Sequence, residues 1–135
     1  MKAVDLVKQD KFAIFLGIKI LEVGGGHAKV SLECGEHCLN GIGRIQGGVT
    51  YTLADYAFAL AVNSAADEME GVACAVGMST TATFLRAGNP GIFYAEAKEV
   101  SKNKTIGHYD VIVSDEKGET VVVFNGVAYF KKDIK

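Results

Sequence analysis

A run of twenty mostly apolar residues, from Gly47 to Ala66, is the feature that most constrains how this chain can fold. The run reads GGVTYTLADYAFALAVNSAA, which is rich in alanine and has no proline, so it favours one long helix. A helix that is apolar on nearly all sides must be enclosed by a bilayer or by the rest of the protein. Because Asp55, Asn63 and several hydroxyl groups interrupt the run, we expect the buried helix of a globular fold.

The composition bounds the remaining possibilities. The chain has 135 residues, of which 49% are hydrophobic and 22% charged, so a single domain over residues 1–135 can bury a core and is not disordered. The net charge is only -2, and no basic stripe interleaved with aromatic residues is present. This argues against a nucleic-acid partner.

The N-terminus and the cysteines indicate the compartment. The segment MKAVDLVKQDKF spaces its charges too closely for a secretion signal. Three cysteines form an odd and sparse set, which is typical of reduced thiols in a cytoplasmic protein. Cys34, His37 and Cys38 lack the second ligand pair of a closed zinc site, so we expect thiols and no metal.

The pattern along the chain predicts a helix, a pair of strands, the long helix and four more strands. The first helix is expected from about Val4 to Phe15, with Gly17 near its end. IKILEV and HAKVSLE flank a glycine triplet and read as two strands around a turn. The later strands are VACAVGMSTTATFL, GIFYAEAKEV, TIGHYDVIVSD and TVVVFNGVAYF, with Pro90 in one turn and Gly118 in the last hairpin.

This order predicts an α+β domain in which one curved antiparallel sheet wraps one buried helix. The last four strands are expected to form a meander. A sheet whose edges must be protected also favours pairing with a second copy of the chain.

The loop before the long helix, LNGIGRIQGG, invites comparison with nucleotide-binding loops. It lacks the preceding buried strand of a dinucleotide fingerprint, and it has no Gly-Lys-Ser/Thr for a phosphate-binding loop. What remains is a helix start at Gly47 whose first amide groups have no partner inside the helix. Gly47 and Gly48 allow an anion or a developing negative charge to approach those amides, although they also suit tight packing of the loop alone.

Asp55 favours the functional interpretation. Its neighbours along the helix are apolar, and burying an unpaired carboxylate costs several kcal/mol or raises its pKa. The alternative is that Asp55 faces solvent or accepts hydrogen bonds from a loop. Gly47 and Asp55 are roughly 12 Å apart along one helix, so they can act on one carbon only across a two-fold dimer with antiparallel helices.

The stretch LNGIGRIQGGVTYTLAD resembles the signature of hotdog-fold acyl-CoA thioesterases of the PaaI-like, 4-hydroxybenzoyl-CoA thioesterase superfamily. The resemblance continues through TTATFLRAG and TVVVFNGVAYF and covers about residues 12–131. It implies a hotdog fold that forms a homodimer, often a dimer of dimers, and hydrolyses an acyl-CoA without a cofactor. It places Asn40 beside the thioester or the attacking water, the Gly47 amide on the carbonyl, and Asp55 from the partner subunit as general base or nucleophile.

The chain departs from this pattern at Gln46, where the family usually has a histidine. Glutamine still donates a hydrogen bond but cannot take up a proton, so we expect an effect on efficiency rather than on the reaction class. Ser79 and Thr80 match a position where relatives often carry a polar group, and ordinary strand hydroxyls are the alternative.

Coenzyme A carries several phosphate charges and needs cations. The candidates are Arg86, Lys98, Lys102 and Lys104, although exposed lysines in a turn are also common for solubility alone. Two rivals remain at this level: a hotdog protein that binds an acyl-CoA or a small acyl ligand without hydrolysing it, and a purely structural assembly protein. Tyr51, Phe58 and Phe84 could line either an aryl slot or an aliphatic tunnel.

Overall fold

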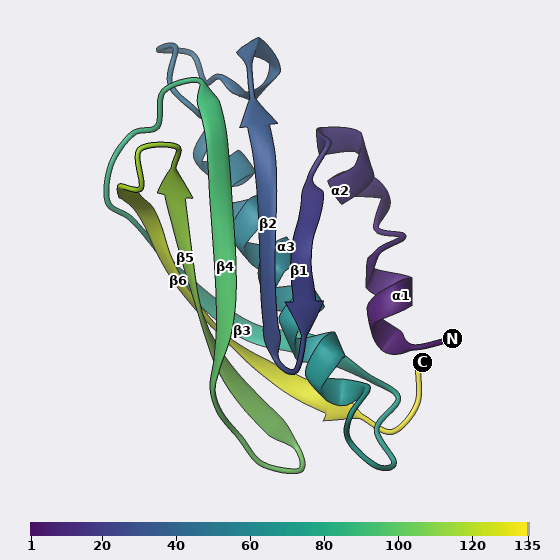
Figure 1. Cartoon of the computed structure of the whole chain (residues 1–135). Helices are drawn as coiled ribbons and strands as arrows, with labels where there is room; N and C mark the ends of the chain where they lie inside the picture. The colour runs from purple at the N-terminus through teal and green to yellow at the C-terminus, as the bar shows by residue number, and fades with distance from the viewer. Residues whose placement is uncertain (135) are drawn as a thin grey trace.

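The computed structural model describes residues 1–134, and its main feature is one six-stranded antiparallel sheet that packs against one long helix (Figure 1). The helices are α1 (Ala3–Val7), α2 (Lys11–Leu16) and α3 (Gly47–Ala66), with a short 3-10 turn, η1 (Glu36–Cys38). The strands are β1 (Lys19–Gly24), β2 (His27–Cys34), β3 (Cys74–Phe84), β4 (Gly91–Lys102), β5 (Ile106–Asp115) and β6 (Thr120–Lys131). The predicted α+β hotdog architecture is confirmed.

The order of the strands corrects one expectation. The sheet runs β1-β2-β4-β5-β6-β3, so only β4, β5 and β6 form a meander. β3 follows α3 in sequence but lies at the far edge of the sheet, paired with β6. The predicted four-stranded meander was therefore wrong at its first strand, because α3 returns the chain to the opposite edge.

The N-terminal segment corrects a second expectation, because two short helices replace the single predicted one. The Asp10 side chain accepts a hydrogen bond from the Ala13 amide (3.0 Å) and so starts a new helix at Lys11. Gly17 ends that helix with a φ of 87°, as its position in the sequence predicted. Farther along the chain, the Asp67 carboxylate holds the start of α1 by accepting from the Ala3 amide (2.7 Å) and the Val4 amide (3.1 Å).

α3 has the predicted bounds and is anchored to the sheet by two polar side chains. The Asn63 amide group donates to the Ala75 carbonyl (3.2 Å), and the Asn63 carbonyl accepts from the Ala75 amide (2.9 Å). The Ser64 hydroxyl accepts from the Gly26 amide (3.0 Å) in the β1–β2 turn. These bonds fix the C-terminal half of α3 against both edges of the sheet. Within the described residues, no helix is long and apolar enough to cross a membrane.

Phe58 sits against the backbone of the sheet because two strands carry glycine beneath it. A Cβ at Gly126 would lie 2.7 Å from the Phe58 ring, and one at Gly77 would lie 3.3 Å from it. The ring also meets Phe124 and Tyr109 at centroid distances of 5.8 and 6.0 Å. This aromatic cluster sets how closely α3 approaches β3 and β6.

We expect Gly126→Ala to destabilise the protein by roughly 1–3 kcal/mol, because the added methyl group overlaps the Phe58 ring. Urea unfolding curves measure the change. Gly41→Ala is the matched control, since a Cβ at Gly41 meets no atom within 4 Å among the described residues, and we expect a change below about 0.5 kcal/mol. In a double-mutant cycle, Phe58→Leu should relieve part of the Gly126→Ala penalty. Strict additivity of the two changes would contradict this packing.

Candidate active site

The first two amide groups of α3 are available as hydrogen-bond donors. Gln46 precedes the helix in an extended conformation (φ -67°, ψ 134°), and its own amide donates to the Cys38 carbonyl (2.8 Å). Within residues 1–134, no protein group accepts from the Gly47 or Gly48 amide. The positive end of the helix dipole lies at this point. The start of α3 can therefore stabilise negative charge on a ligand.

The two glycines are closely surrounded. A Cβ at Gly47 would be 3.5 Å from the Phe84 ring, which is ordinary contact, whereas a Cβ at Gly48 would be only 2.6 Å from Gln46 Oε1. The Gln46 carboxamide thus lies beside the exposed backbone of Gly48. It provides no side-chain cap to the helix.

Asn40 organises the loop that leads into α3. Its side-chain oxygen accepts from the amides of Ile42 (3.0 Å) and Arg44 (3.1 Å), and its own amide donates to the Arg44 carbonyl (2.7 Å). Arg44 donates to the Asn89 side chain (2.9 Å), which ties the loop to the β3–β4 connection. The Asn40 oxygen is therefore engaged in the loop, and its amide nitrogen is the part that can face a ligand.

Asp55 lies on the face of α3 that stays exposed in the single chain, together with Gly48. The expectation of a buried carboxylate was therefore wrong for one chain taken alone. Protein atoms packed around the carboxyl still remove part of its hydration, and this raises its pKa. The nearby charge of Asp10, at the start of α2, raises the pKa of Asp55 further. Asp10 was not identified from the sequence as a neighbour of Asp55. Asp10 directly precedes the helical segment KFAIFL, and an aspartate in that position is a helix-capping signal.

The adjacent residues Thr80 and Ser79 on β3 point to opposite faces of the sheet. The Thr80 hydroxyl makes a hydrogen bond of 2.5 Å with the Tyr51 hydroxyl, and Tyr51 lies one helical turn before Asp55 on α3. Thr80 therefore borders the exposed face of α3. Ser79 directly precedes Thr80 on β3. Because successive side chains of a strand alternate, the exposed Ser79 points to the other face of the sheet.

The candidate cations lie at two ends of the molecule. Arg86 forms an ion pair with Glu119 near the start of α3, and its Nε donates to the Thr120 carbonyl (3.1 Å). At the other end, Lys102 pairs with Glu99 (3.3 Å). Lys104 lines a cavity of about 690 Å³ just beyond the C-terminal end of α3. One chain alone does not bring these lysines to Gly47.

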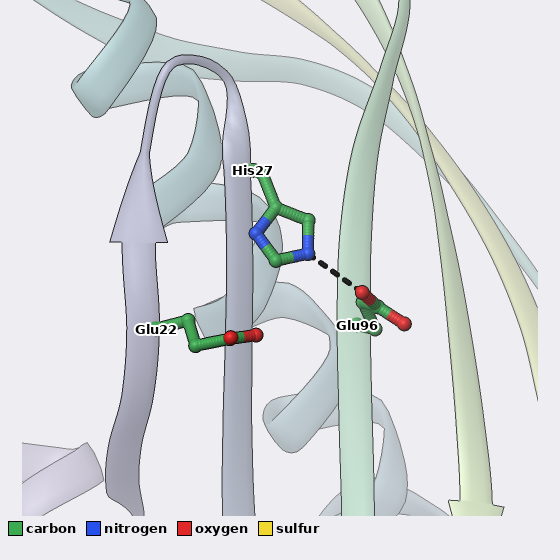
Figure 2. A group of neighbouring side chains, drawn as sticks. All are labelled: Glu22, His27 and Glu96. Atoms are coloured by element: carbon green, nitrogen blue, oxygen red, sulfur yellow. Dashed lines mark hydrogen bonds and ion pairs between the residues drawn. The ribbon is translucent and has the colours of Figure 1, made fainter.

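A separate polar cluster occupies the outer face of the sheet, away from α3. Glu22, His27 and Glu96 come from three neighbouring strands and turn toward one another (Figure 2), with ligand atoms within 4.8 Å of one another. His27 Nε2 and Glu96 are 2.6 Å apart, and this hydrogen bond, ahead of the nearby charges, lowers the pKa of Glu96. Lys98 and Lys29 also face Glu96 and supply positive charge of their own. The cluster thus consists of a hydrogen-bonded His27–Glu96 pair with the Glu22 carboxylate beside it, and it lies on the face of the sheet opposite α3 and Asp55.

The cysteine-rich segment is not arranged as a ligand set. Cys34 and Cys38 are buried, whereas His37 between them is exposed. Burial, with a contribution from Cys38, raises the pKa of Cys34 to about 12. A thiol that stays protonated is a poor nucleophile.

Comparison with known proteins agrees with this fold. The family model of the thioesterase superfamily matches residues 42–122. The acyl-coenzyme A thioesterase PaaI of Escherichia coli is 34% identical over 125 residues, covering 92% of this chain and 85% of that protein. The solved structure of that PaaI protein, from the phenylacetic acid degradation operon, superposes with a TM-score of 0.86 over 96% of this chain and 90% of that chain, at 33% identity. The 1,4-dihydroxy-2-naphthoyl-CoA hydrolase of Listeria monocytogenes is 27% identical over 89% of this chain and 95% of that protein.

We expect Asp10→Asn to lower the pKa of Asp55, because the substitution removes a nearby negative charge that disfavours the ionised carboxylate. Asparagine keeps an acceptor oxygen for the Ala13 amide, so α2 remains capped. The measurement is an NMR titration of the Asp55 carboxyl carbon in both proteins. Asp5→Asn, on α1, is the control with the same change of charge. An Asp55 titration midpoint that is unchanged in Asp10→Asn would contradict the proximity of the two carboxyl groups.

Proposed function

The chain belongs to the thioesterase superfamily, and from this premise we propose that it hydrolyses an acyl-CoA to a free acid and coenzyme A. The observation that carries the proposal is the combination found on α3. Two amide donors that have no acceptor within residues 1–134 open the helix, and a carboxylate of raised pKa lies two turns farther on, on an exposed face. A thioester hydrolase needs one group to polarise a carbonyl and another to deliver water or attack directly.

We propose that these two groups meet across a homodimer. On one helix they are roughly 12 Å apart, so they cannot reach one carbonyl carbon. The exposed face of α3 lies beside β3, whose outer edge has no strand partner within the described residues. β3 also carries exposed apolar side chains at Val76 (43%) and Met78 (58%). An antiparallel pairing of two such edges and two such helices would set the Gly47 amide of one subunit against Asp55 of the other.

In the proposed reaction the thioester carbonyl accepts a hydrogen bond from the Gly47 amide, which stabilises the negative charge that forms on oxygen. Asp55 either removes a proton from water as water adds to the carbonyl carbon, or attacks that carbon itself. In the first route the C–S bond breaks as the water adduct collapses, and the proton taken up by Asp55 passes to the departing sulfur. In the second route the C–S bond breaks as an anhydride forms between the acyl group and Asp55, the departing sulfur takes a proton from solvent, and water then cleaves the anhydride to give the free acid and restore Asp55. The raised pKa makes Asp55 a stronger base than an ordinary aspartate. No metal or cofactor is required by this scheme.

The remaining predicted residues take supporting roles. We propose that the side-chain amide groups of Asn40 and Gln46 donate to the thioester or to the water, and that Gly48 keeps the backbone open to the substrate. Thr80 borders the Asp55 face through Tyr51. Lys102 and Lys104 are proposed to attract the phosphates of coenzyme A, whereas Arg86, which is paired with Glu119, stays a prediction in that role. Ser79 has no such placement in one chain and stays a prediction, as do the dimer of dimers and the cytoplasmic location.

Gly47→Pro tests the amide directly. Proline has no N–H but is favoured at the first position of a helix, and the extended conformation of Gln46 suits a residue before proline. We expect a loss of about 10²–10³ in kcat with the fold retained. Gly47→Ala keeps the amide and adds a methyl group in ordinary contact with Phe84, so it should stay within a few-fold of the wild type. Equal activity of the two variants would remove the amide from the mechanism.

Asp55→Ala should abolish turnover without changing the oligomeric state. Mixing it with Gly47→Pro then tests whether the site is shared. After random exchange of subunits about half of the dimers are mixed, and each mixed dimer has one site with both groups intact, so about a quarter of the wild-type activity should return. Activity that stays absent in a mixture proven by mass spectrometry to exchange would place both groups in one chain.

Assays with a panel of acyl-CoA esters distinguish hydrolysis from binding without hydrolysis. Release of free thiol, followed with a chromogenic thiol reagent, supports hydrolysis. Binding by calorimetry without thiol release from any ester would favour an acyl-CoA-binding protein. Absence of both binding and release would favour the structural rival.

A further inference from the structure

A cavity of about 300 Å³ opens beside the first turn of α3. Its lining is mostly apolar and includes Ile45, Gly47, Thr50, Phe84 and Val121. Gly47, whose amide has no acceptor in the described part of the chain, thus borders this cavity. A cavity of ~150 Å³ is enough to hold benzene, so this one has room for a larger apolar group.

The Phe84 ring forms the part of the cavity wall that lies beside Gly47. It is the last residue of β3, and its ring lies within 3.5 Å of the position that a Gly47 Cβ would take. The side chain is half exposed (52%), so no tight packing fixes its size. The following residue, Leu85, is equally exposed (55%) but does not line the cavity.

The charges around the cavity argue against the nucleotide part of coenzyme A as its occupant. An adjoining cavity of about 420 Å³ shares Arg86, Ala87, Gly88 and Val121 with it and extends to the β5–β6 hairpin. That hairpin contributes Asp115, Glu116 and Glu119 against one lysine, Lys117. Arg86 is already paired with Glu119. Phosphates would meet net negative charge on this side.

Resting on the proposed function, we propose that the cavity beside Gly47 holds the apolar acyl group of the substrate and that Phe84 sets the size of acyl group accepted. A carbonyl that accepts from the Gly47 amide would then have its acyl side in the cavity and its sulfur side toward the more open face of α3. Acyl groups too small to fill the cavity would gain little from it, and Phe84 would restrict the largest ones.

The test compares kcat/KM for acetyl-, octanoyl- and phenylacetyl-CoA in four proteins: the wild type, Phe84→Ala, Phe84→Trp and Leu85→Ala. We expect Phe84→Ala to raise the preference for octanoyl- or phenylacetyl-CoA over acetyl-CoA by about tenfold and Phe84→Trp to lower it by a similar factor. Leu85→Ala should keep the wild-type ratio within about twofold. If Phe84→Ala fails to fold, the Phe84→Trp ratio still decides. The octanoyl and phenylacetyl arms distinguish an aliphatic from an aryl substrate.

A binding experiment locates the acyl group independently of turnover. In the Asp55→Ala protein, octanoyl-CoA should shift the methyl NMR signals of Thr50 and Val121, whereas coenzyme A alone should not. Equal shifts with both ligands would show that the pantetheine arm occupies the cavity and would overturn the inference. Selectivity ratios that are the same in all four proteins would overturn it too, while thiol release by the wild type would leave the proposed hydrolysis standing. A wild type that releases no thiol from any ester would end the proposed hydrolysis, and the methyl shifts would then decide the place of the acyl group alone.

Discussion

The enclosure of α3 is the constraint on which the rest of the structure depends. The helix is apolar on nearly all sides, and the sheet covers the side that carries Leu53, Ala57 and Leu60, all fully buried. α1 and α2 cover a second side through the Tyr56 hydroxyl, which donates to the Val7 carbonyl (3.0 Å). A third face stays open in the single chain, and it is the face that carries the carboxylate. Because one face of this largely apolar helix stays exposed, the fold favours a second copy of the chain that covers this face.

The packing that holds α3 also positions the groups near Asp55. The Tyr51 ring meets the buried Phe124 edge-on at 5.5 Å, and its hydroxyl reaches out to Thr80. Phe124 in turn contacts Phe58, which is seated on the glycine backbone of the sheet. Side chains whose rotamers are fixed by such packing hold a site more accurately than side chains on free loops. The glycines under Phe58 do not touch Asp55, but they affect its position because they set how closely α3 approaches the sheet.

The parts of the fold that depend on local sequence were predictable, and those that depend on distant contacts were not. The bounds of α3 followed from its glycines and its apolar run, and the strand β5 followed from the segment TIGHYDVIVSD. The place of β3 beside β6 depends on pairing over some fifty residues, for which the sequence has no local signal. Asp10 was missed as a neighbour of Asp55 for the same reason, since it meets α3 only through the fold. The split of the first helix was a different kind of error, because the capping aspartate was visible in the sequence.

If two copies pair as proposed, two opposing effects set the pKa of Asp55. Covering Asp55 with a second subunit removes more of its water and, taken alone, disfavours the ionised form. The same pairing brings the positive end of the partner's helix toward the carboxylate, which favours the ionised form. The two effects oppose each other, so the carboxylate can stay ionised enough to act as a base while remaining poorly hydrated. A histidine in place of Gln46 would add a titrating charge to this balance, whereas the neutral carboxamide leaves it to the helix dipole and Asp10.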